Sequence, residues 1–127
     1  MLNPIPSEVD VAVIGAGSAG LPAFRAAREH TDRVILIERG PHGTTCARVG
    51  CMPSKLLIAA AEAAHGMEIA PVFGIHPGSI RIDGEAVMER VRRERNRFVG
   101  FVLDGVDRID SEQKISGQAR LVVDTRF

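Results

Sequence analysis

Val-Asp-Val-Ala-Val-Ile-Gly-Ala-Gly-Ser-Ala-Gly, residues 9–20, is a β-branched apolar run followed at once by a glycine-rich hexapeptide. A short apolar run of this kind, here Val9–Ile14, is typical of a strand buried in a parallel sheet. The hexapeptide has the spacing G-x-G-x-x-G. In this pattern the first glycine makes a tight turn, the second lets the backbone approach a pyrophosphate, and the third allows close helix–strand packing. The pyrophosphate would lie on free N–H groups at the start of the next helix.

The residues after that helix strengthen the prediction of a nucleotide site. Arg33–Ile37 is a second apolar run that predicts a strand, and Glu38 ends it with an acidic side chain. Such a carboxylate can accept hydrogen bonds from an adenosine ribose. The alternative, that the glycines serve only a βαβ turn, is less favoured because turn, helix and acid all occur together. Pro22 lies about one turn into the helix, so an irregular first turn is expected.

A second informative segment, residues 43–55, contains both cysteines of the chain. In an ideal helix the Cα atoms of Cys46 and Cys51 would lie roughly 8.6 Å apart, beyond the ~7 Å that a disulfide tolerates. A bridge therefore needs a bent backbone, which Gly50 can supply, while Pro53 suits the first turn of a helix. Cys51 would then lie at a helix N-terminus, where the helix dipole and Lys55, one turn on, favour a thiolate. The segment predicts a dithiol–disulfide switch.

Two other interpretations of the cysteines compete with a redox disulfide. A zinc site would need two further ligands, for which His42 and His65 are the candidates. The C-x4-C spacing is unusual for such a site, and His65 is expected a helix length away. Two inert buried thiols would need neither a bend glycine, nor a Pro-led helix, nor a lysine at that offset. The redox disulfide is favoured, and no metal site is predicted.

Thr45-Cys46 and the run Val-Gly-Cys-Met-Pro-Ser-Lys over residues 49–55 resemble the redox-disulfide segment of the flavin-dependent pyridine nucleotide–disulfide oxidoreductases. The Pro-Ser-Lys ending is more similar to dihydrolipoamide dehydrogenase and mercuric reductase than to glutathione reductase. The family usually has Gly-Gly-Thr-Cys and an Asn before Val-Gly-Cys. This chain instead has Thr44 before Thr45-Cys46, and Arg48 in place of the Asn.

The resemblance implies FAD as the cofactor, and roles for the cysteines follow from it. Cys46 would be the interchange thiol, Cys51 the charge-transfer thiolate beside the isoalloxazine, and Lys55 a cation near the reducible nitrogen of the flavin. The full set of cofactor-binding residues that the resemblance implies is Gly15, Gly17, Ser18, Ala19, Gly20, Glu38, Thr45, Cys46, Lys55 and Ala119.

The resemblance also implies an activity and partners. The first expectation is a dihydrolipoamide dehydrogenase-like enzyme that passes electrons from a small dithiol or lipoyl group to NAD(P) through FAD. The alternatives are a mercuric reductase-like enzyme and a non-catalytic flavin-binding or thiol-sensing module. The full-length enzyme is expected to be a homodimer, and the nicotinamide domain is expected to be absent from this chain. Residues 1–127 are therefore expected to be inactive alone.

The expected fold class is α/β: an incomplete, Rossmann-like FAD-binding domain over residues 1–127, with a parallel sheet and helices on both faces. A third strand is expected at Lys114–Gly117, the start of a strand-like stretch that extends to Val123. Leu56–Ala64 is apolar nearly all round, so a buried helix that ends at Gly66 is expected. A loop is expected over residues 70–82, and then a helix from Asp83 to about Gly105 with a solvated arginine face.

Composition excludes several functional classes. Hydrophobic residues make up 45% of the 127 residues and charged residues 25%, as in ordinary globular proteins. Lys plus Arg equals Asp plus Glu at 16 each, so net charge indicates neither a nucleic-acid nor a membrane partner. The N-terminal residues do not read as a signal peptide, and a cytoplasmic protein is expected.

Overall fold

The computed structural model describes residues 5–122. The chain divides into two compact units. The first, here called the sheet unit, comprises residues 1–44 and 102–127, and the second, the helical unit, comprises residues 45–101. Each is described by itself. The expectation of one domain over residues 1–127 stays a prediction.

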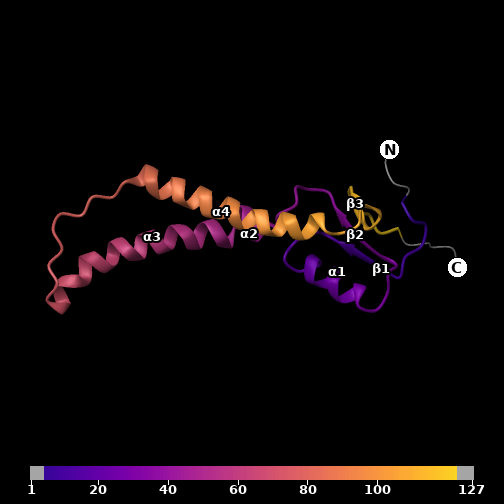
Figure 1. Cartoon of the computed structure of the whole chain (residues 1–127), viewed down its shortest axis with the longest axis horizontal. Helices are drawn as coiled ribbons and strands as arrows, with labels where there is room; N and C mark the ends of the chain where they lie inside the picture. Colours follow the sequence, from indigo (N-terminus) through magenta and orange to yellow (C-terminus); the bar gives the residue numbers. More distant parts are fainter. Residues whose placement is uncertain (1–4, 123–127) are drawn as a thin grey trace. The chain divides into compact units, whose positions relative to one another are not determined.

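The sheet unit is built on three parallel strands in the order β1-β2-β3 (Figure 1). Their bounds are Val11–Ile14 for β1, Val34–Glu38 for β2 and Lys114–Ser116 for β3. The expected parallel sheet and its third strand are confirmed. The strand-like stretch beyond β3 is not a strand, since the described residues 117–122 have no regular structure.

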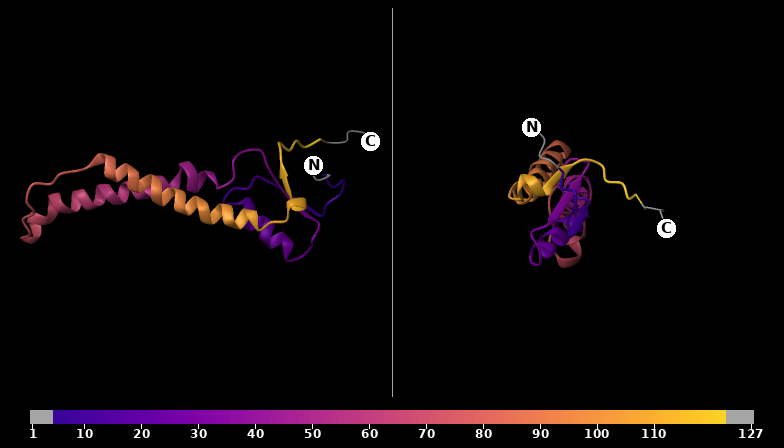
Figure 2. Two further views of the ribbon diagram at one scale, coloured as in Figure 1. Left: turned by 45° about the horizontal axis from the view of Figure 1, so that its top comes forward. Right: turned by 90° about the vertical axis from the view of Figure 1, so that its right-hand side faces the viewer.

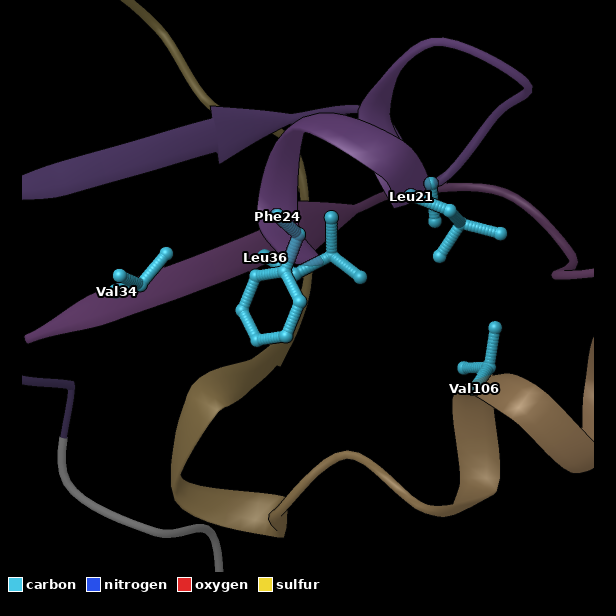
Figure 3. Close-up of a cluster of buried hydrophobic side chains, with 6 residues drawn as sticks. Leu21, Phe24, Val34, Leu36 and Val106 are labelled. Atoms are coloured by element: carbon cyan, nitrogen blue, oxygen red, sulfur yellow. The ribbon is translucent and has the colours of Figure 1, made fainter. Parts of the chain in front are cut away.

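Helix α1, Gly20–Arg28, packs on one face of this sheet. The core cluster in Figure 3 joins side chains of α1 and β2 to Val106 from the last turn of α4, Gly84–Asp107. Leu36, Val34 and Val106 are the largest fully buried side chains. Full burial of a Leu or Val side chain contributes about 1.5–3 kcal/mol, so this cluster holds the glycine-rich turn onto the sheet.

Helices on both faces were expected, but the described residues cover only one face of β1. Val11 and Val13 pack against the core cluster, whereas Ala12 and Ile14 are exposed, Ile14 by 58%. The expectation is wrong here for a topological reason. The connection from β1 to β2 and the connection from β2 to β3 both move the chain to the next strand on the same side. Right-handed connections between parallel strands that progress in one direction place their helices on the same face of the sheet.

The first turn of α1 is regular, so the irregularity expected at Pro22 is not found. Pro22 is the third residue of the helix. The backbone hydrogen bonds on either side of it are made, from Leu21 N to Gly17 O and from Ala23 N to Ala19 O, both at 3.1 Å. A proline this early is tolerated because its ring meets little preceding helix.

The helical unit contains α2, Thr45–Val49, α3, Cys51–Ile69, the 3-10 turn η1, Ala70–Phe73, and most of α4. In Figures 1 and 2, α3 and α4 lie side by side and are joined by the segment that follows η1. Arg90 Nη1 on α4 donates to the carbonyl of Leu56 on α3 at 3.4 Å. Asp83 caps the start of α4 by accepting from Ala86 N at 3.0 Å, as the predicted boundary requires.

Two expectations about α3 are wrong. No residue of this helix is buried, although its sequence is apolar nearly all round. Nor does it end at Gly66, since helix and 3-10 turn continue to Gly74, whose φ of 76° supplies the left-handed cap. By length and composition Thr45–Phe73 could cross a membrane, with a mean hydropathy of 1.3, a test that core helices of soluble proteins also pass.

Candidate functional site

The three glycines of the turn after β1 occupy three different environments. Gly15 has a φ of 99° and its N–H bonds the carbonyl of Ile37 at 2.7 Å, so it needs the freedom of glycine. A Cβ at Gly20 would lie 1.8 Å from the carbonyl oxygen of Gly15, so only hydrogen fits there. A Cβ at Gly17 would meet nothing within 4 Å. Gly15 thus makes the turn, Gly17 leaves open space beside the backbone, and Gly20 allows the close contact of helix and strand.

The start of α1 offers unpaired donors beside that open space. Among the described residues, the N–H groups of Gly17, Ser18 and Ala19 have no hydrogen-bond partner. Unpaired N–H groups at a helix start carry partial positive charge and bind anions. These residues therefore fit a pyrophosphate, as the sequence pattern predicts.

Glu38 at the end of β2 accepts two short hydrogen bonds, one from the glycine-rich turn and one from the segment that follows β2. Its Oε2 accepts from Ala16 N and its Oε1 from Gly40 N, both at 2.7 Å. The Ala16 N–H, followed by that of Gly40, holds the pKa of this carboxyl below its ordinary value. Sequence reasoning assigned Glu38 to a ribose and missed this bond to the turn. The adjacency of β1 and β2 was the signal that could have revealed it.

A cleft of about 280 Å³ opens at the carboxyl ends of the three strands. Ligands of open α/β sheets bind at this edge. The cleft brings together three predicted site residues, Gly15, Glu38 and Ala119. Another cleft, of about 350 Å³, lies at the amino ends of the strands around Pro6 and Arg33, and none of the predicted site residues lines it.

The two cysteines lie on either side of a helix break. Helix α2 ends at Val49, Gly50 follows, and Cys51 is the first residue of α3. A Cβ at Gly50 would lie 3.2 Å from the carbonyl oxygen of Thr45 and 3.4 Å from the Cα of Cys46, so glycine permits this close return. The predicted bend is confirmed, and Pro53 lies in the first turn of α3.

Both cysteines are free thiols. The neighbouring Cys51 side chain, followed by burial, raises the pKa of Cys46, against a lowering influence of the Lys55 cation. Cys46 is half-buried and Cys51 is exposed. The break at Gly50 lies between the two cysteines, and their role as a redox disulfide stays a prediction.

The residues just before the first cysteine are conformationally unusual. Gly43 has a φ of 104° and Thr44 a φ of 58°. A left-handed backbone is natural for glycine and an outlier for a β-branched residue. Thr44 is the position at which the chain departs from the Gly-Gly-Thr-Cys pattern, so the departure places a strained residue beside the redox segment.

The zinc interpretation finds no ligand set in the structure. His65 lies fourteen residues after Cys51 on the same helix, about 21 Å away at the rise of an α-helix. The other candidate, His42, belongs to the sheet unit, and its Nδ1 is buried without a hydrogen-bond partner in the described part of the chain. Within residues 5–122 no three His, Cys, Asp or Glu side chains are grouped to hold a metal ion.

The predicted site residues fall into two sets, one in each unit. The sheet unit carries the glycine-rich turn, Glu38 and Ala119, and the helical unit carries Thr45, Cys46, Cys51 and Lys55. Each set is assembled within its own unit.

Known proteins resemble this chain over both sets. The sequence profile described as pyridine nucleotide-disulphide oxidoreductase matches residues 9–125. A mercuric reductase of Serratia marcescens is 48% identical over 102 residues, which cover 76% of this chain and 22% of that protein. A dihydrolipoyl dehydrogenase of Chlamydia pneumoniae is 37% identical over 109 residues, 86% of this chain and 23% of that protein. A mercuric reductase of Streptomyces lividans is 45% identical over 80 residues, 62% of this chain and 17% of that protein.

The chain spans about a fifth of the length of these curated relatives. The matched range, residues 9–125, includes the glycine-rich turn, Glu38 and both cysteines. The chain belongs to the pyridine nucleotide-disulphide oxidoreductase family.

Proposed function

We propose that the protein is an FAD-dependent thiol–disulfide oxidoreductase that moves electrons between a dithiol, such as a dihydrolipoyl group, and NAD. The observation that carries this proposal is the helix break at Gly50, where the backbone returns close to Cys46 just before Cys51 begins α3. A bend of this kind is what a disulfide between these two positions requires. We propose the cytoplasm as its compartment, where a cysteine pair is more often catalytic than structural.

The residues present fit the cofactor. The N–H groups of Gly17, Ser18 and Ala19 would hold the pyrophosphate. Glu38 would accept from the ribose, because an ionised carboxylate has about four acceptor positions and the N–H groups of Ala16 and Gly40 use two. In the proposal, Ala119 lines the adenosine end of the site, and Thr45 and Lys55 contact the flavin end. When bound, FAD would supply two-electron transfer between the cysteine pair and the nicotinamide.

The cysteine chemistry can be written from the residues of this chain. A substrate thiolate attacks Cys46 Sγ of the oxidised pair, and Cys51 leaves as a thiolate. The N-terminus of α3 and the Lys55 cation stabilise that negative charge. The second substrate thiol then displaces Cys46, which yields a cyclic disulfide product and the reduced pair.

A second candidate function is reduction of Hg²⁺ with a reduced nicotinamide as donor. It is favoured by the higher identity to mercuric reductases, 48% over 102 residues compared with 37% over 109 for a dihydrolipoyl dehydrogenase. Soft thiolate ligands such as a cysteine pair suit such a metal ion. A third possibility is a flavin-binding or thiol-sensing module without turnover.

The test uses the protein expressed from its complete reading frame. Flavin absorbance reports FAD, and reduction of NAD⁺ by dihydrolipoamide is compared with oxidation of NADPH by Hg²⁺. With FAD bound, Cys46→Ser is expected to keep a long-wavelength thiolate-to-flavin absorbance, and Cys51→Ser to lose it. Identical spectra of the two variants would contradict the assigned roles. If the protein binds FAD but catalyses neither the reduction of NAD⁺ nor the reduction of Hg²⁺, the non-catalytic flavin-binding or thiol-sensing module is the remaining candidate.

A further inference from the structure

We propose that the helical unit binds an amphipathic carboxylate, of the class of medium-chain fatty acid anions, in a groove formed by α3, α4 and the segment that joins them (Figure 1). The groove has a volume of about 670 Å³, and the residues that line it lie between positions 60 and 90, within one unit of the chain. Binding sites for small molecules commonly have about 300–1,000 Å³. The lining includes neither cysteine and no residue of the glycine-rich turn, so the groove binds its ligand independently of FAD.

The groove has an apolar lining that comes from both helices. Ala60, Ala63 and Ala64 have the spacing i, i+3, i+4, which places them on one face of α3. Val87 of α4 and Ile80 of the joining segment belong to the same lining. Burying apolar area is favourable in proportion to the area removed from water, so this lining favours a ligand with an apolar body.

Charged groups in the lining favour a negatively charged head group. Arg90 uses Nη1 for the carbonyl of Leu56, at 3.4 Å, and a guanidinium has five N–H donors. Arg81 has no hydrogen-bond or ion-pair partner within residues 5–122. Asp83 is the one acidic residue among the described residues of the lining, and its Oδ1 already accepts from Ala86 N as the cap of α4. Guanidinium groups with free donors bind carboxylates through charge-assisted hydrogen bonds.

A carboxylate on an apolar chain matches both parts of the lining. A fully apolar ligand would give the two guanidinium groups no anion, and an inorganic anion would leave the alanine face of α3 in water. The ligand class that satisfies both parts is a monocarboxylate with a flexible hydrocarbon chain.

The test measures binding of radiolabelled decanoate to the chain of 127 residues by equilibrium dialysis, below the concentration at which decanoate forms micelles. Decanoate is expected to bind at a single site per chain. From hexanoate to decanoate, the affinity should rise about fourfold for each methylene that is buried. Decylammonium, which has the same chain length and a positive charge, should bind at least about tenfold more weakly, because both arginines repel it.

Variants of the lining are paired with variants outside it. Ala63→Phe fills the groove and is expected to abolish binding of decanoate, whereas Ala59→Phe, at an exposed position of α3 outside the lining, should not. Arg90→Gln should weaken binding of decanoate about threefold or more, whereas Arg92→Gln, which removes an exposed cation of α4 outside the lining, should not. Circular dichroism checks that the four variants keep the helix content of wild type.

Four results would overturn the proposal. The first is equal affinity of wild type for decanoate and decylammonium, which needs no variant to fold. The second is equal affinity of Ala63→Phe and Ala59→Phe for decanoate. The third is binding of the chain to phosphatidylglycerol vesicles without binding of free decanoate, which would make the groove a membrane contact. The fourth is self-association that Ala63→Phe abolishes while wild type binds no decanoate, which would make a second copy of the chain the occupant.

Discussion

Gly20 and Gly17 differ in the space around them, and this difference predicts opposite consequences for the same substitution. A Cβ at position 20 would lie 1.8 Å from a backbone oxygen, whereas a Cβ at position 17 would meet nothing within 4 Å. Gly20→Ala is expected to destabilise the chain by about 3 kcal/mol or more, because backbone must move. Gly17→Ala should change stability by less than about 1 kcal/mol but weaken FAD binding at least about tenfold.

Urea unfolding and FAD titration of both variants test this prediction. Equal loss of stability in the two would show that the turn does not pack as described. Unchanged FAD affinity in Gly17→Ala would contradict the pyrophosphate role of this turn.

The Glu38 carboxylate should make stability depend on pH. Because its pKa in the folded chain lies below its ordinary value of 4.5, its contribution is fully present above that pH and is lost as the pH falls through the folded pKa. Glu38→Gln is expected to be less stable than wild type at neutral pH and to lose less stability on acidification. Urea unfolding at a series of pH values measures the stability at neutral pH and its dependence on pH.

The control for this prediction is Glu29→Gln, at an exposed carboxylate. If Glu29→Gln and Glu38→Gln reduced the pH dependence of the unfolding free energy equally, the result would argue against the hydrogen bonds of Glu38 to Ala16 and Gly40.

Thr44 offers a test of backbone strain. At a φ of 58° a β-branched residue costs about 1–2 kcal/mol, part of which glycine recovers despite its more flexible unfolded state. Thr44→Gly is therefore expected to raise the free energy of unfolding by roughly 0.5–1 kcal/mol. Thr45→Gly, at the first residue of α2, should not be stabilising. Denaturant midpoints decide between these outcomes, and a destabilised Thr44→Gly would mean that contacts of the threonine outweigh its strain.

At the scale of elements, two glycines near the end of α3 have different roles that the sequence alone does not reveal. Gly66 lies inside the helix with open space around a would-be Cβ, and Gly74 has a φ of 76°. Gly66→Ala is expected to stabilise the chain by about 0.5–1 kcal/mol through helix propensity, and Gly74→Ala to destabilise it by a similar amount. Helix content by circular dichroism and urea midpoints report both. A destabilised Gly66→Ala together with a stabilised Gly74→Ala would indicate that the helix ends at Gly66, as the sequence predicted.

The elements that sequence reasoning predicted correctly are those set by local chemistry. The existence of the strand β1, the glycine spacing and the bend at Gly50 each depend on a few neighbouring residues. What it missed depends on partners distant in sequence. The bond from Glu38 to the turn depends on strand pairing, and the exposure of α3 depends on which surfaces meet it. A hydropathy pattern predicts that an apolar face is buried, but it does not identify the surface that packs against that face.

At the scale of the whole chain, apolar surface remains open in each unit. In the sheet unit Ile14 is exposed by 58%, on the face of β1 that no described helix covers. In the helical unit the exposed apolar side chains include Leu57, Ile58, Met67, Ile69, Val72, Phe73, Ile75, Ile80 and Ile82. Because exposed apolar surface marks sites of protein contact, we expect these side chains to be contact surfaces.

The purified 127-residue chain is therefore expected to self-associate in solution. Its apparent mass in sedimentation experiments should rise above 13.7 kDa as concentration increases, because burying apolar area is favourable in proportion to the area removed from water. Two matched variants locate the responsible surface. Ile14→Thr should reduce association if the open face of β1 is responsible, and Phe73→Ser, at a side chain exposed by 74%, if the end of the α3–η1 helix is responsible. A chain that remains monomeric at every concentration would show that these exposed side chains do not drive association, and it would remove the argument that they are contact surfaces.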